Sequence, residues 1–213
     1  MLAFEHLDLN KYCEDFTSNE DDTLKELERQ THLLTLSPQM LSGKIQGRFL
    51  STLSKLLKPT YILEIGTFTG YSALCLAEGL EENGVVHTVD ISADYQHLID
   101  QYAKKSAFAS KVVWHRGDAL DVIQTMKFSW DIVFVDGAKN QYLDYLHAVK
   151  SQIRPGGLLI TDNVLWSGKV LLEKKDKDTQ IIHSYNEYLL TLEDFTTVIL
   201  PIRDGISLSF KNQ

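Results

Sequence analysis

The chain has 213 residues, and its 44% hydrophobic and 23% charged content is typical of one globular domain with a full α/β core. Its 29 acidic and 21 basic residues give a net charge of −8, which argues against a broad nucleic-acid or anionic-membrane surface. No stretch reaches membrane-spanning length, and residues 1–6 lack the basic start and apolar run of a signal peptide. We therefore expect a cytoplasmic protein with small neutral or cationic partners.

We expect the chain to begin with a helical preface, residues 1–58, that belongs to the same domain as the core at 59–213. Leucines at three- and four-residue steps predict one helix over 21–36, and a similar apolar pattern predicts a second over 46–57. Ser37-Pro38 marks the break between them. The short segment 41–44 is interpreted either as a lid at the edge of a ligand site or as a plain connector.

From residue 61 onward, apolar strands alternate with helices, which predicts a doubly wound, mostly parallel sheet. The predicted strands are 61–65, 85–90, 112–115, 131–135, 158–161, 195–200 and 206–210. The predicted helices are 72–81, 95–105, 120–126, 141–153 (stopped at Pro155-Gly156-Gly157) and 180–192. The link at 202–205 is too short for a parallel crossover, so we expect the last two strands to be antiparallel.

The first strand leads into a glycine-containing turn and then a helix, in the sequence YILEIGTFTGYS at 61–72. Glycines at such a bend let the backbone approach a ligand, and the following helix start offers unpaired N–H groups. Gly66 and Gly70 are separated differently from the glycines of the G-x-G-x-x-G dinucleotide motif. An ordinary βα turn is the alternative interpretation of the glycines alone.

Two acidic residues at strand ends favour a particular ligand for this turn. Glu64 would repel a pyrophosphate and attract an ammonium group. Asp90 ends the next strand, at about the distance from the glycines where a ribose-binding carboxylate is expected. An acid for an amino group and an acid for a ribose indicate S-adenosylmethionine rather than NAD.

Polar residues also follow the later strands, and the carboxyl ends of parallel strands meet at one edge of a sheet. If the fourth and fifth strands are neighbours, Asp136, Asp162 and Asn163 converge as three hard oxygen donors for a Mg²⁺-like cation. Lys139 would lie beside that cation and lose its proton readily enough to act as a general base. The alternatives are loop-capping acids and a surface lysine.

Asp118 follows the third strand at a place suited to the exocyclic amine of an adenine. An equally plausible interpretation is that Asp118 caps the helix that follows.

In order and spacing, four separated motifs resemble the cation-dependent class I O-methyltransferases of the catechol and caffeoyl-CoA type: EIGTFTGYS from Glu64, VDGAK from Val135, DNVLWSG from Asp162, and DGI from Asp204. The resemblance implies a seven-stranded Rossmann-like sheet with an antiparallel last strand, S-adenosylmethionine as donor, and Mg²⁺, Mn²⁺ or Ca²⁺ on Asp136, Asp162 and Asn163. It further implies Lys139 as base beside Asp136, Trp166 near the acceptor, and a donor site formed by Ser42, Glu64, Gly66, Thr67, Ser72, Asp90, Asp118, Ala119 and Asp136.

Ala138 departs from this family pattern, because caffeoyl-CoA-type members typically carry Asp there and catechol-type members an aromatic residue. We expect transfer of a methyl group to a vicinal-diol aromatic molecule, and a homodimer that uses apolar positions of the preface such as Leu33, Leu34 and Leu36. One alternative is a family member that methylates a hydroxyuridine in tRNA through a basic rim of Lys44, Arg48, Lys169, Lys174, Lys175 and Lys177. Another is a non-catalytic nucleotide-binding or NAD-binding domain.

Overall fold

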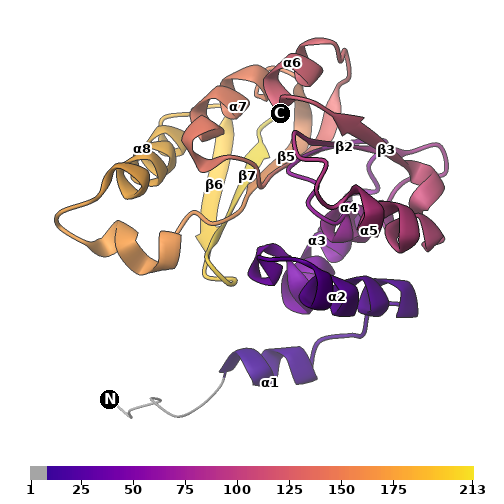
Figure 1. Cartoon of the computed structure of the whole chain (residues 1–213). Helices are drawn as coiled ribbons and strands as arrows, with labels where there is room; N and C mark the ends of the chain where they lie inside the picture. The colour runs from indigo at the N-terminus through magenta and orange to yellow at the C-terminus, as the bar shows by residue number, and fades with distance from the viewer. Residues whose placement is uncertain (1–8) are drawn as a thin grey trace.

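The computed structural model describes residues 9–213, in which helices cover both faces of a central sheet (Figure 1). The start of the chain, where no signal peptide is expected, lies outside the described residues. Within the described part, no helix combines the length and apolar character needed to cross a membrane.

Seven strands form the sheet in the order β3-β2-β1-β4-β5-β7-β6. Their bounds are β1 Tyr61–Ile65, β2 Val85–Asp90, β3 Val112–Arg116, β4 Trp130–Val135, β5 Ile153–Thr161, β6 Phe195–Leu200 and β7 Ile206–Lys211. Strands β1 to β5 pair in parallel, whereas β7 is antiparallel to both β5 and β6. The expected doubly wound sheet with an antiparallel last strand is therefore confirmed.

The alternation of side chains along the strands divides the core between the two faces of the sheet. Ile62 packs in a cluster with α2 to α5, and Leu63 packs in a second cluster with α6 to α8. The helices of the first face are α2 Asp22–Leu34, α3 Gly43–Leu57, α4 Tyr71–Ala77 and α5 Gln96–Gln101. Those of the second face are α6 Ala119–Gln124, α7 Tyr142–Val149 and α8 Lys177–Leu190. Short 3₁₀ turns are η1 Pro38–Met40, η2 Ala103–Lys105, η3 Ala109–Lys111, η4 Lys139–Gln141 and η5 Trp166–Leu171.

The helical preface contains α2, α3 and one helix that the apolar pattern does not predict, α1 Leu9–Asp15. Helix α2 begins where the side chain of Asp21 accepts a hydrogen bond from the backbone N–H of Leu24 at 2.8 Å. It buries Leu24 and Leu27, whereas Leu33 and Leu34 at its end are exposed. The described preface packs on the first face of the sheet through α2 and α3.

Three predicted helices are shorter than expected. The predicted helix 141–153 ends at Val149, because β5 already begins at Ile153 and pairs with Trp130. Pro155-Gly156-Gly157 lies inside β5 instead of stopping a helix. It falls at a register shift whose extra residues are on β5, because Trp130 pairs with Ile153 and Ile132 pairs with Leu158. An irregular stretch of this kind tolerates the missing N–H of proline. The predicted helix 95–105 divides at Tyr102 into α5 and η2, and 72–81 ends at Ala77.

Candidate active site

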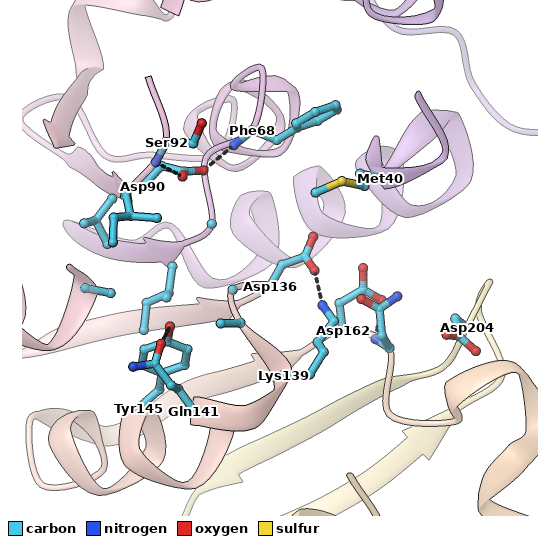
Figure 2. A pocket seen from close by; sticks show the side chains of 18 of the residues that line it. Met40, Phe68, Asp90, Ser92, Asp136, Lys139, Gln141, Tyr145, Asp162 and Asp204 are labelled. Carbon is cyan, nitrogen blue, oxygen red and sulfur yellow. Dashed lines mark hydrogen bonds and ion pairs between the residues drawn. The ribbon is translucent and has the colours of Figure 1, made fainter. Parts of the chain in front are cut away.

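A cavity of about 880 Å³ opens at the carboxyl ends of the parallel strands, where the strand order reverses between β1 and β4. Figure 2 shows side chains from these strand ends facing one another across it. The cavity is lined by nine residues of the predicted site: Gly66, Asp90, Asp118, Ala119, Asp136, Lys139, Asp162, Asn163 and Trp166.

The other predicted donor residues lie beside or beneath this cavity. Ser42, Thr67 and Ser72 line a small recess that shares Gly66 and Asp136 with the large cavity. Glu64 lines neither space, because its side chain is fully buried. The structure thus brings every predicted site residue to one end of the sheet.

The glycine turn approaches the neighbouring strand too closely for any side chain at Gly66. Gly66 has φ 103°, and a Cβ atom there would lie 2.3 Å from the backbone oxygen of Asp136. Gly70 has φ 87° and precedes α4 directly. The two glycines therefore allow a tight turn in which the backbone itself forms the cavity wall.

Asp90 holds the glycine turn in place. Its Oδ2 atom accepts hydrogen bonds from the backbone N–H groups of Thr67 at 3.0 Å and Phe68 at 2.9 Å, and Oδ1 accepts one from Ser92 at 2.8 Å (Figure 2). A carboxylate has about four lone-pair positions, so a ribose hydroxyl can still donate to it. Asp90 has a structural role that the sequence did not indicate.

Glu64 lies at the end of a buried chain of hydroxyl groups. Its Oε2 accepts from the Thr88 hydroxyl at 2.5 Å, and Thr88 contacts the Thr67 hydroxyl at 2.6 Å. Burial raises the pKa of Glu64 to about 8, although the nearby hydroxyl groups of Ser72 and Thr88 oppose the shift. Within residues 9–213 no group lies in hydrogen-bond geometry with the Oε1 atom, which leaves a buried acceptor beside the donor recess.

Asp118 caps α6 through a hydrogen bond of 2.8 Å from the backbone N–H of Leu120 to Oδ1. The helix-capping interpretation is confirmed, and Asp118 also lines the cavity. Capping uses one carboxylate oxygen only, so the second remains for a ligand amine.

Asp136 and Lys139 form an ion pair in the cavity wall, with 2.9 Å between Oδ1 and Nζ (Figure 2). Burial raises the pKa of Asp136 to about 6, Lys139 opposes this, and the nearby charge of Asp162 adds to it. Burial is the main cause of the shift, and the Asp162 carboxylate contributes to it from the end of the neighbouring strand β5.

Asp162 and Asn163 follow β5 and are fixed from three directions. The Gln46 side chain donates to Asp162 Oδ2 at 2.8 Å, and the Asn163 backbone N–H donates to Oδ1 at 2.7 Å. The Tyr142 hydroxyl donates to the backbone oxygen of Asp162 at 2.9 Å. Asn163 itself has φ 57°, a left-handed conformation that asparagine tolerates better than most residues.

The oxygen atoms of Asp136, Asp162 and Asn163 match the chemistry of a hard divalent cation. Within residues 9–213, no group of three or more His, Cys, Asp or Glu side chains is arranged to hold a metal ion. The predicted set is of another kind, since it combines two carboxylates with one amide.

Several cavity residues were missed by the sequence analysis. They come from the η1 segment, the glycine turn, the region after β2, η4 and α7, η5, and the turn between β6 and β7: Gln39, Met40, Phe68, Ile91, Ser92, Tyr95, Gln141, Tyr145, Ser167, Arg203 and Asp204. Asp204 was visible as part of a family motif without a role. Phe68 and Ser167 likewise lie in family motifs without a role. The remaining residues have no local signal that points to the cavity.

A doubly wound sheet with this strand order, a glycine turn after β1 and acids at the strand ends defines a Rossmann-like methyltransferase. A family model described as O-methyltransferase matches residues 14–212, and the chain belongs to that family. A caffeoyl-CoA O-methyltransferase 2 from Zea mays is 32% identical over 94% of this chain and 81% of its own length. A caffeoyl-CoA O-methyltransferase 3 from Nicotiana tabacum is 34% identical over 79% of this chain and 75% of its own length.

Solved structures agree with the family assignment. The O-methyltransferase TomG from Streptomyces achromogenes, in complex with S-adenosylmethionine, is 27% identical, with a TM-score of 0.88 and 100% coverage of both chains. An O-methyltransferase from Bacillus cereus in complex with S-adenosylhomocysteine is 27% identical, with a TM-score of 0.86 and coverage of 95% and 96%. The chain is therefore an S-adenosylmethionine-dependent O-methyltransferase, and the interpretation as a non-catalytic or NAD-binding domain is wrong.

Proposed function

We propose that this enzyme methylates one hydroxyl of a small aromatic molecule with two vicinal hydroxyls, with a divalent cation on Asp136, Asp162 and Asn163. The observation that carries the proposal is the convergence of these oxygen donors with Lys139 on one side of the cavity. When bound there, a divalent cation holds two adjacent oxygens and lowers the pKa of one of them.

The donor is proposed to lie across the ends of β1, β2 and β3. The unpartnered Oε1 of Glu64 suits the donor's ammonium group, Asp90 suits the ribose, and Asp118 with Ala119 suits the adenine. Ser42, Thr67 and Ser72 would surround the amino-acid end in the recess. In the proposed arrangement the methyl group would face Asp136 and Lys139.

Lys139 is proposed to take the proton from the attacking hydroxyl at its Nζ atom. In the structure an ion pair with Asp136 holds Nζ in the cavity wall, 2.9 Å from Oδ1, and Lys139 can act as the base only after Nζ has lost a proton to become a neutral amine. Trp166, at the cavity edge, would limit where a flat acceptor can lie. We expect most of the rate enhancement to come from the alignment of hydroxyl and methyl by these groups, because two reactants held in the reactive geometry do not have to find it by diffusion.

The tRNA alternative gains no support from the predicted basic rim. Arg48 forms an ion pair with Glu78 and is largely buried, and Lys169 lies 3.8 Å from Asp176. Lys44 donates to the backbone oxygen of Glu14 at 2.7 Å. These contacts direct part of the rim's positive charge toward the protein itself.

The experiment is an acceptor panel with labelled donor: vicinal diphenols, hydroxycinnamoyl thioesters, matched monophenols and bulk tRNA, each with and without Mg²⁺. The proposal expects transfer only to acceptors with two adjacent hydroxyls and only with the cation. Transfer to monophenols at the same rate, or to tRNA alone, would contradict it.

We also propose that the enzyme is a homodimer joined through the preface. Leu33, Leu34 and Leu36 are 63%, 52% and 95% exposed, which is unusual for three neighbouring leucines. Light scattering at micromolar concentration should give twice the mass of the chain, and Leu33→Glu with Leu36→Glu should give the monomer. A wild-type monomer would contradict this proposal without affecting the enzymatic one.

A further inference from the structure

Arg203 lies in the turn between β6 and β7 and binds a segment far away in the sequence. Its guanidinium donates through Nη1 to the backbone oxygens of Leu41 and Ser42, and through Nη2 to that of Gln39 at 3.0 Å. Arg203 itself has φ 51°, so its backbone adopts a conformation that costs free energy for a residue with a Cβ atom. Three acceptors for one side chain define the position of the segment 39–42 closely.

The segment 39–42 forms part of both ligand spaces. Gln39 and Met40 line the large cavity, while Leu41 and Ser42 line the small recess of the proposed donor site. Helix α3 starts immediately afterwards, and Ser42 at its N-terminus has no side-chain capping bond. Among the described residues, the oxygens of Gln39 and Ser42 have no other protein hydrogen-bond partner outside helix contacts, so Arg203 supplies what the segment lacks.

The turn that carries Arg203 is itself held firmly. Asp204 Oδ1 accepts from the Ser167 backbone N–H at 2.5 Å, and the backbone oxygens of Asp204 and Gly205 accept from Leu165 at 2.9 Å and Val164 at 3.1 Å. A Cβ atom at Gly205 would lie 2.3 Å from Leu165 Cγ. The turn is thus packed against the segment that carries Trp166. From this turn the side chain of Arg203 reaches the segment 39–42.

We propose that Arg203 is a positioning residue that fixes the segment 39–42, so that binding of the S-adenosyl donor depends on it. The side chain itself lines the large cavity, and it holds the segment through the backbone oxygens of Leu41, Ser42 and Gln39. An arginine suits this task because its planar fork has several donors in a fixed geometry, whereas lysine has one compact ammonium group. The proposal rests on the donor site of the proposed function.

The test compares Arg203→Gln and Arg203→Lys with the matched control Arg154→Gln. Like Arg203, Arg154 is held by hydrogen bonds from its guanidinium group. Its acceptors are the Asp131 carboxylate and the Pro155 backbone oxygen, and they lie at the opposite end of the sheet from the cavity. Titration calorimetry with S-adenosylhomocysteine should show affinity reduced about tenfold or more in Arg203→Gln and by a smaller factor in Arg203→Lys. Arg154→Gln should lower the melting temperature and leave this affinity unchanged.

Two further readouts separate positioning from general stability. Amide hydrogen exchange over 39–46 should be faster in both Arg203 variants than in wild type, and the KM for the donor should rise more than kcat falls. Unchanged affinity in Arg203→Lys, or weaker binding with wild-type exchange at 39–46, would overturn the proposal. If Arg203→Gln does not fold, Arg203→Lys decides the question alone.

Discussion

The side-chain amide of Gln46 lies 2.8 Å from Oδ2 of Asp162 and thereby joins helix α3 of the preface to the end of β5. Both residues are buried, Gln46 completely and Asp162 with 4% exposure. A hydrogen bond to a buried carboxylate orients it, so the preface contributes to the geometry of the proposed cation site.

Replacement of Gln46 by leucine should therefore reduce turnover more than donor binding. Loss of a hydrogen bond to a charged group costs on the order of 1.5–3 kcal/mol, which corresponds to about a tenfold or greater decrease in kcat. Steady-state kinetics and calorimetry with S-adenosylhomocysteine measure the two effects separately. Gln152→Leu is the control. Gln152 also makes a side-chain hydrogen bond, which Oε1 accepts from Trp130 Nε1 at 3.2 Å, but this bond does not lie at the cavity. Equal losses in the two variants would contradict this role of Gln46.

Donor binding should be linked to the release of a proton from Glu64. The pKa of Glu64 is raised to about 8 by burial, so the free enzyme holds Glu64 protonated at pH 7, whereas an ammonium ligand favours the carboxylate. Affinity for S-adenosylhomocysteine should rise about fivefold between pH 7 and pH 8, and about tenfold in all before it levels off near pH 9. Calorimetry in two buffers of different ionisation enthalpy measures the proton release directly.

Glu64→Gln provides the comparison, since it keeps the shape of the side chain and removes the titration. In this variant the affinity should be low and independent of pH through the same window. A pH dependence equal to that of wild type would show that another group releases the proton.

Local patterns in the sequence predicted the strands well, because each strand is an apolar run bounded by turn residues. The bounds of β1, β2 and β6 are those expected, and the short link between β6 and β7 correctly indicated an antiparallel pair. The end of the helix before β5 was placed too late. Pairing of Ile153 with Trp130 determines the start of that strand, and a partner on another strand leaves no local signal.

The residues of the candidate site also differ in whether a local sequence pattern indicates them. Glu64, Asp90, Asp136 and Asp162 could be found because polar residues stand out at the ends of apolar strands. Gln46 and Arg203 could not, because their positions depend on contacts between segments far apart in the chain. Ala138 departs from the family pattern and left the contact with the donor at that position undefined, and the structure shows that Ala138, Gln141 and Tyr145 all line the cavity.

The glycine turn should tolerate no side chain at Gly66. In Gly66→Ala the new Cβ atom would lie 2.3 Å from the backbone oxygen of Asp136, so β1 or β4 must shift. We expect donor affinity to fall below detection by calorimetry. Gly168→Ala is a matched control, since Gly168 also has positive φ, at 74°, with nothing within 4 Å of a Cβ atom. It should cost only the conformational strain, about 1 kcal/mol of folding stability.

Stability toward acid should depend on His87. Burial lowers the pKa of His87 to about 4, and the ring of His115, bonded at 2.9 Å, adds to the shift. The folded protein therefore prefers the neutral ring, and its stabilisation is complete above the unfolded pKa of 6.5 and is lost as pH falls toward 4. The loss should be on the order of 2–3 kcal/mol in urea unfolding experiments.

His87→Phe should flatten this pH dependence, because Phe128 and Trp130 already surround the ring with aromatic groups. His97→Phe is the control, because His97 is exposed, and this variant should retain the pH dependence of the wild-type protein. An unchanged slope in His87→Phe would assign the acid sensitivity to other groups.

The requirement for a cation at Asp136, Asp162 and Asn163 is tested most directly by single-turnover methyl transfer to a vicinal diphenol. The enzyme is loaded with labelled S-adenosylmethionine, treated with excess EDTA, and then supplied again with Mg²⁺. We predict that EDTA abolishes transfer while the donor stays bound, that Mg²⁺ restores it, and that Asp162→Ala shows no restoration. Full transfer by the wild-type enzyme in excess EDTA would contradict the proposed mechanism.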